Sequence, residues 1–151
     1  WNAGDDGLDT DQAWTGTVDN FAVITPGGHC FELDGPEGPA NTNPHTIKNG
    51  YVNAENAGDL INTDANTYVN LQNIFITGIK AGQVVRHNAP GTGVVTYTGI
   101  NLDIPSGVVT DYIKNNAGAA VAVAGIVKGT ANTFNAAPLS WTWASKAGAL
   151  N

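Results

Sequence analysis

The chain has 151 residues, of which 42% are hydrophobic and 13% are charged, and its formal net charge at pH 7 is −7. This length and composition suit one domain with a sizeable apolar core. Six Lys and Arg residues against 13 Asp and Glu residues exclude binding of nucleic acid by phosphate neutralisation, and no apolar run is long enough to span a membrane.

Taken in chain order, four segments of the sequence align with one another without gaps. Their last residues are 23, 30 and 24 positions apart, at Asp11, Asp34, Asp64 and Asn88. Each begins with a bend of small residues and passes an apolar residue before it ends. A second aligned segment follows each of the first, around Asn20, Asn49, Asn73 and Gly99. Repeats of ~20–30 residues made of short strands are typical of a parallel β-solenoid.

We therefore expect one all-β domain over residues 1–151, a right-handed parallel β-helix with a short C-terminal cap. The predicted rungs are 4–24, 27–53, 57–77, 81–104 and, less regular, 107–127, with the cap at 139–151 and a loop inserted at 35–44. The predicted inward columns are Val18, Ile47, Leu71 and Tyr97, then Phe21, Ile74 and Ile100, then Val23, Val52, Ile76 and Leu102. Asn20, Asn49 and Asn73 are expected to stack as a structural hydrogen-bonded ladder at the ~4.8 Å strand spacing.

Three stretches resemble recurring segments of large secreted β-helix lipoproteins from gliding Gram-negative bacteria. They are residues 3–20, 32–38 and 141–145. The resemblance implies a pectate-lyase-like β-helix at the outer-membrane surface or outside the cell. It also implies that this chain is the C-terminal part of a longer protein, whose preceding part would stack on the first rung. It supplies no catalytic residues that can be carried over.

The acidic residues are predicted to stack in two outward rows. One row is Asp9, Glu32, Asn62 and Arg86, and the other is Asp11, Asp34, Asp64 and Asn88. Like charges ~5 Å apart destabilise a sheet unless a cation or a proton relieves them. Because Ca²⁺ prefers six to eight oxygen ligands, we expect it as a possible cofactor; a solvated acidic face is the alternative. The predicted calcium ligands are Asp9, Asp11, Glu32, Asp34 and Asp64.

The function that these features favour is a non-catalytic surface module, adhesin-like or glycan-binding. Aromatic residues near turns suit the apolar faces of sugar rings, and the candidates are Trp14, Tyr51 and Tyr68. One alternative is a polysaccharide hydrolase or lyase with paired carboxylates at Asp9, Asp11, Glu32 and Asp34. Another is a scaffold or cargo subunit of an outer-membrane or secretion complex.

Overall fold

The computed structural model describes residues 1–11, 13–36, 43–88 and 93–150, which lie mostly in β-strands and turns. Residues 37–42 of the predicted inserted loop and residues 89–92 of the predicted rung 81–104 lie outside the described residues. Helical structure within the described ranges is limited to η1 (Val109–Tyr112), η2 (Ala137–Leu139) and α1 (Trp143–Lys146). No helix in that part of the chain is long and apolar enough to cross a membrane.

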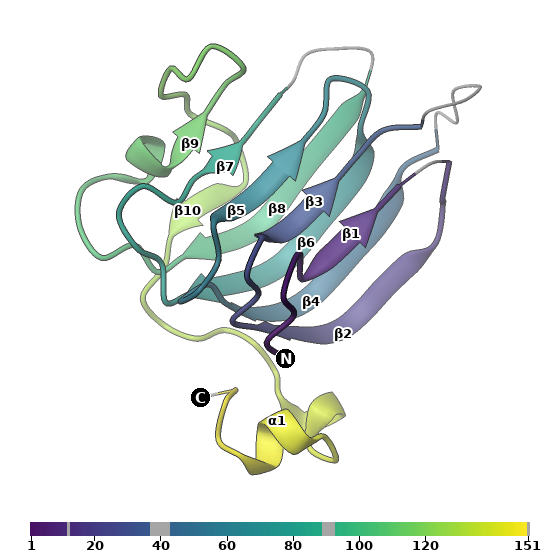
Figure 1. Cartoon of the computed structure of the whole chain (residues 1–151), viewed down its shortest axis with the longest axis vertical. Helices are drawn as coiled ribbons and strands as arrows, with labels where there is room; N and C mark the ends of the chain where they lie inside the picture. The colour runs from purple at the N-terminus through teal and green to yellow at the C-terminus, as the bar shows by residue number, and fades with distance from the viewer. Residues whose placement is uncertain (12, 37–42, 89–92, 151) are drawn as a thin grey trace.

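The described strands form two five-stranded sheets, and every pairing within them is parallel. The short-strand sheet contains β1 (Leu8–Thr10), β3 (His29–Leu33), β5 (Asp59–Thr63), β7 (Val85–Arg86) and β9 (Ile113–Lys114). The long-strand sheet contains β2 (Thr17–Ile24), β4 (His45–Asn53), β6 (Tyr68–Thr77), β8 (Val94–Leu102) and β10 (Ile126–Lys128). Successive strands alternate between the two sheets, so each coil contributes one strand to each (Figure 1). The predicted all-β parallel solenoid is confirmed.

Apolar side chains fill the inside of the coil in columns that follow the strand register. Val18 is paired with Ile47, Ile47 with Leu71, and Leu71 with Tyr97, as the repeat predicts. The column Val23, Val52, Ile76 and Leu102 is in register as well. Since a single coil could not bury these side chains, the stack of coils makes the core.

Each long strand bends at one residue with a left-handed backbone. The φ angles are 57°, 57°, 51° and 65° at Asn20, Asn49, Asn73 and Gly99. Asn and Gly adopt this region at lower cost than other residues. The bend also interrupts the two-residue alternation of a strand. As a result Val18 and Phe21, three positions apart, both pack against the core.

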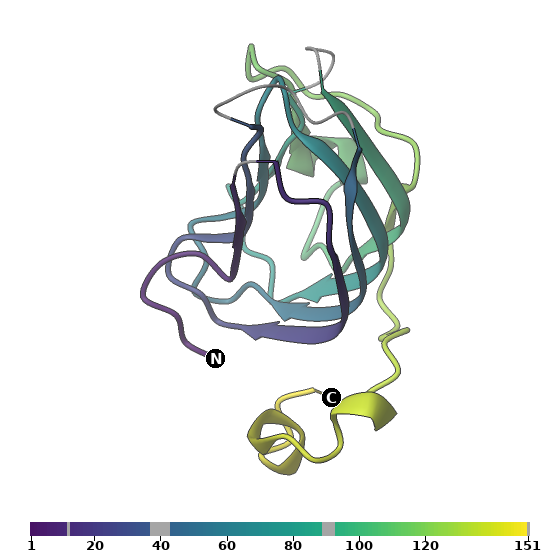
Figure 2. The same cartoon turned by 90° about the vertical axis from the view of Figure 1, so that its right-hand side faces the viewer.

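The tail that follows the last strand lies outside the coil (Figure 2). Leu150 and Phe134 pack against Ile24, Tyr51 and Phe75, which point outward from the long-strand sheet. The tail thus covers a flank of the solenoid, whereas the sequence predicted that residues 139–151 would cap an end. Apolar residues on the outer face explain this difference, because the tail removes them from water.

Candidate functional site

The outer face of the short-strand sheet carries a row of polar side chains. Register pairs Asp9 with Glu32, Glu32 with Asn62, Asn62 with Arg86, and Arg86 with Lys114. The first three pairings confirm the predicted register of this row, and the fourth extends it to Lys114. Along the row the charge changes from acidic to basic over strands ~4.8 Å apart.

The second predicted row lies one residue beyond the same strands. Asp11, Asp34 and Asp64 directly follow the last residues of β1, β3 and β5. The backbone N–H of Asp34 donates to the carbonyl oxygen of Thr10 at 3.0 Å, which continues the parallel pairing past the strand ends. Asp11 and Asp64 are exposed and Asp34 is partly buried.

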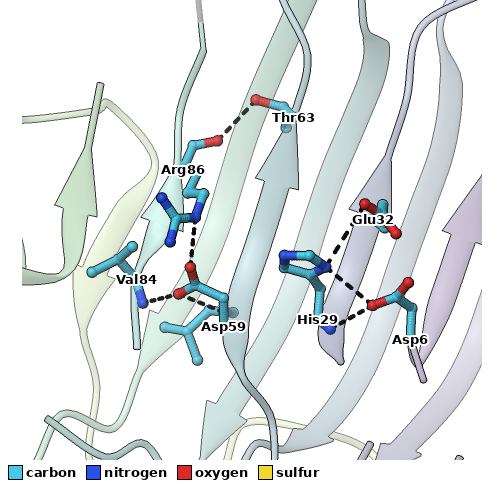
Figure 3. Close-up of polar contacts among 8 residues, drawn as sticks. Asp6, His29, Glu32, Asp59, Thr63, Val84 and Arg86 are labelled. Carbon is cyan, nitrogen blue, oxygen red and sulfur yellow. Dashed lines mark hydrogen bonds and ion pairs between the residues drawn. The ribbon is translucent and has the colours of Figure 1, made fainter. Parts of the chain in front are cut away.

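Two carboxyl groups and one imidazole converge on this face. Among the described residues, the one group of three metal-ligating side chains with donor atoms within 4.8 Å of one another is Asp6, His29 and Glu32 (Figure 3). We call these three residues the acid–imidazole cluster. His29 Nδ1 lies 3.1 Å from Asp6 Oδ1 and 3.8 Å from Glu32 Oε1. Only Glu32 belongs to the calcium ligand set predicted from the sequence.

The two carboxyl groups of this cluster have pKa values displaced in opposite directions. Burial opposes ionisation of Asp6, but hydrogen bonds with Glu32 and His29 outweigh it and hold the pKa of Asp6 below its usual value. The hydrogen bond with Asp6, assisted by burial and by the Asp6 charge, raises the pKa of Glu32 to about 7. Near neutral pH Glu32 therefore shares its proton with Asp6.

The hydrogen bond between Asp6 and Glu32 leaves no room between them for the water molecule that inverting glycoside hydrolysis requires. Inverting enzymes separate the two groups by ~6.5–9.5 Å to admit a water molecule, and retaining enzymes by ~5–5.5 Å. The Asp6 and Glu32 donor atoms lie within 4.8 Å and share a hydrogen bond. Of the four predicted catalytic carboxylates (Asp9, Asp11, Glu32 and Asp34), only Glu32 is in this pair.

A buried carboxylate in the next coil is fully engaged in bracing the sheet. Asp59 accepts hydrogen bonds from the backbone N–H groups of Leu60 and Val84, and from Arg86 Nε at 2.7 Å (Figure 3). The Asp59 side chain is 5% exposed, whereas that of Arg86 is 56% exposed. We therefore assign Asp59 a structural role.

The predicted aromatic residues lie in three different environments. Trp14 is 43% exposed, and its ring packs against that of His45 at a centroid distance of 5.1 Å with an interplanar angle of 45°. It lines a hollow of about 260 Å³ together with Leu8, Asp9, Thr10, Asp11 and Val18. Tyr68 is partly buried. Tyr51 is 2% exposed beneath Phe134 of the tail, so the expectation that it is exposed to a ligand is wrong.

A larger hollow, of about 480 Å³, lies where the tail crosses the bend of the long strands. We call it the amide groove, and its lining residues are Asn20, Asn49, Asn73, Gly99, Asn101, Thr133, Phe134 and Asn135. The sequence identified the Asn20–Asn49–Asn73 column but gave it only a structural role. The second wall, residues 133–135, comes from the tail, whose position no repeat signal indicates.

Hydrogen bonds hold both walls of the amide groove. Asn73 Nδ2 donates to Asn49 Oδ1 at 3.3 Å, and Asn49 Nδ2 donates to Asp19 Oδ1 at 2.7 Å. This confirms the asparagine ladder between Asn49 and Asn73. In the tail, Asn135 Oδ1 accepts the backbone N–H of Ala137 at 3.1 Å. The groove is thus bordered by side chains whose orientation the fold determines.

Comparisons of the chain with models of known protein families, with curated proteins and with solved structures find no match.

Proposed function

We propose that this chain is a non-catalytic carbohydrate-binding module that holds a neutral, hydroxyl-rich sugar in the amide groove. The observation that carries the proposal is the lining of the groove. Every lining residue that the structure describes is uncharged, and the set combines amides, a hydroxyl group and one aromatic ring. Ligand sites commonly combine an apolar surface with a few oriented polar groups in this way.

The ladder amides keep hydrogen-bonding capacity for a ligand. An asparagine side chain has two N–H donors and an oxygen with two lone pairs. Asn49 uses one N–H toward Asp19 and accepts one bond from Asn73, so half of its hydrogen-bonding capacity is used by these two neighbours. Adjacent donor and acceptor atoms of this kind suit vicinal hydroxyl groups, each of which donates and accepts.

The aromatic wall gives the apolar part of the site. Phe134 is partly buried, and its ring packs on Tyr51 at a centroid distance of 6.0 Å, which fixes its orientation. A rigid ring binds with little loss of conformational entropy, and it can pack on the C–H face of a pyranose. The groove therefore offers an apolar contact opposite a row of amides.

The geometry supports binding without chemistry at this groove. The acid–imidazole cluster is located on the short-strand sheet, whereas the groove follows the bend of β2, β4, β6 and β8. A hydrolase needs an acid and a base at the bound sugar, and no lining residue of the groove that the structure describes carries a carboxyl group.

We further propose that the module acts at the cell surface, as the resemblance to secreted β-helix lipoproteins implies. The acidic composition suits a solvated extracellular protein, and at this location the expected partner is an outer-membrane complex. Immunolabelling of intact cells tests this placement, and labelling seen only after the cells are opened would contradict it.

The experiment for the binding proposal is an array of neutral and acidic oligosaccharides, followed by calorimetry with the best neutral probe. Asn73→Gly removes one amide and copies the natural Gly99 of the next coil, so the left-handed backbone is retained. We expect at least about tenfold weaker binding for Asn73→Gly, because a site built on hydrogen bonds depends on each of them. Phe134→Ala should weaken binding by a similar factor, because it removes the apolar contact with the sugar ring.

The matched control is Asn56→Ser, which removes an exposed amide outside the groove. It should bind as the unaltered protein does. The proposal fails if no neutral sugar binds, or if Asn73→Gly and Phe134→Ala stay folded by circular dichroism and bind as tightly as the control.

A further inference from the structure

We propose that Asp6, His29 and Glu32 bind one divalent transition-metal ion of the zinc class at the N-terminal edge of the short-strand sheet. This inference is independent of sugar binding. It also differs from the calcium site that the sequence predicted, both in its ligands and in the type of ion.

The distances between the donor atoms suit a small tetrahedral ion. Zn²⁺ binds histidine nitrogen and carboxylate oxygen at ~2.0–2.2 Å, so tetrahedral geometry holds two such donors about 3.3 Å apart. His29 Nδ1 is 3.1 Å from Asp6 Oδ1 and 3.8 Å from Glu32 Oε1. All three donor atoms lie within 4.8 Å of one another before any ion draws them together.

The backbone brings the three donors to one side of the sheet. Cys30 and Phe31 are consecutive and both completely buried, so His29 and Glu32 face outward although they are three residues apart. Asp6 comes from the turn before β1, and its Oδ1 also accepts the backbone N–H of His29. Figure 3 shows Nδ1 of the imidazole facing both carboxyl groups. An ion here would connect the first coil to the second.

The partial burial of the cluster favours binding while leaving access for an ion. The Asp6 side chain is 9% exposed, and those of His29 and Glu32 are each 29% exposed. When both carboxyl groups are ionised they repel each other in this partly buried position, and a divalent cation that replaces the shared proton removes that repulsion. Three protein ligands and one open position facing solvent make a typical zinc coordination set.

The donor types select the class of ion. An imidazole nitrogen is a good ligand for Zn²⁺, Co²⁺ and Ni²⁺, whereas Ca²⁺ and Mg²⁺ prefer oxygen ligands. Ca²⁺ also needs six to eight donors, and the described cluster offers three side chains. We therefore expect Zn²⁺ and Co²⁺ to bind in clear preference to Ca²⁺.

Co²⁺ is the direct probe, because its visible absorption reports the ligand geometry. Titration of the whole chain with Co²⁺ should give a saturating absorption band with one equivalent, and Zn²⁺ should abolish that band by displacement. Calorimetry with Zn²⁺ then gives the affinity. Ca²⁺ at the same concentration should not displace Co²⁺.

Two variants and a control assign the site. His29→Gln and Glu32→Gln should each lower the Zn²⁺ affinity at least about tenfold and remove the Co²⁺ band. The control, His87→Gln, replaces a histidine on another coil and should retain both. Glu32→Gln can still hydrogen-bond with Asp6, so it tests the site even if His29→Gln unfolds.

Several outcomes would overturn the proposal. No Co²⁺ band with the folded chain would exclude the site. A band that survives in folded Glu32→Gln, or that disappears in His87→Gln, would place the ion elsewhere. Displacement of Co²⁺ by equimolar Ca²⁺ would show that the imidazole does not determine the choice of ion.

Discussion

The long-strand sheet and the short-strand sheet contribute differently to the stability of the solenoid and to the ionisable groups on its surface. The long-strand sheet has strands of nine or ten residues in β4, β6 and β8, and residues on both of its faces are buried by the core and the tail. The short-strand sheet has five residues in β3 and β5 and two in β7 and β9, and its outer face is charged. The difference indicates that the long strands supply most of the stability, while the short strands present most of the ionisable groups.

The largest expected effect tests where the stability resides. Ile74 in β6 and Ile113 in β9 are both completely buried. Ile→Ala substitutions in cores cost about 2–5 kcal/mol, and less where the surroundings can collapse. Urea unfolding should place Ile74→Ala near the upper end of this range and Ile113→Ala near the lower end. Equal losses, or a larger loss at Ile113, would contradict the comparison between the sheets.

A smaller effect is expected from the buried carboxylate of the short-strand sheet. Asp59→Asn removes the charged acceptor of the hydrogen bonds that Val84 N–H and Arg86 Nε donate. We expect the free energy of unfolding to fall by about 2 kcal/mol, and not by more, because water can still hydrate the exposed Arg86 side chain. Lys48→Gln in the exposed Asp19–Lys48 pair of the long-strand sheet is the control and should leave the unfolding midpoint unchanged. If both variants unfold like the parent, Asp59 does not brace the sheet.

The dependence of stability on pH gives a third test, at the junction of the two sheets. Burial lowers the pKa of His45, whose Nε2 lies 3.2 Å from the Thr10 hydroxyl. The unfolded chain therefore takes up a proton below pH ~6.5 that the folded chain does not, and this group's contribution is lost as the pH falls through that value.

The slope from this group is at most about 1.4 kcal/mol per pH unit. Urea unfolding at several pH values between 5 and 7.5 should show a weaker dependence in His45→Gln than in the parent. His87→Gln is the comparison variant: the pKa of His87 is lowered by burial too, so only the double variant should lose both contributions. An unchanged slope in His45→Gln would mean that His45 titrates alike in both states.

The smallest expected effect concerns calcium at the row Asp11–Asp34–Asp64. If the sequence prediction holds, excess Ca²⁺ should raise the melting temperature relative to a chelator, and Asp64→Asn should reduce that rise. The same melt with Glu32→Gln separates this row from the acid–imidazole cluster. No rise with Ca²⁺ would leave these carboxylates as a solvated face.

The register of the coils could be predicted because each repeat carries the residues that set it. Apolar residues recur at corresponding positions of each repeat, and asparagine or glycine marks each bend, so Val18, Ile47 and Leu71 align from the sequence. A shift by one residue would turn every apolar side chain outward, and this makes such a pattern specific.

The candidate sites could be predicted only in part. Simple alternation places His29 and Glu32 on opposite faces, and the consecutive burial of Cys30 and Phe31 is what brings them together. The tail leaves the repeat after β10, so neither its position on the flank nor the burial of Tyr51 follows from periodicity. Contacts between segments without a shared repeat are set by tertiary packing.

Sugar binding in the amide groove can be tested directly by an NMR titration of the ¹⁵N-labelled chain with the neutral oligosaccharide that binds best on the array. We expect the side-chain amide signals of Asn49, Asn73 and Asn101 to shift together with saturation, while the indole signal of Trp14 does not shift. Shifts at Trp14 without shifts at these amides would rule out the amide groove and would locate the sugar at the hollow beside Asp9 and Asp11.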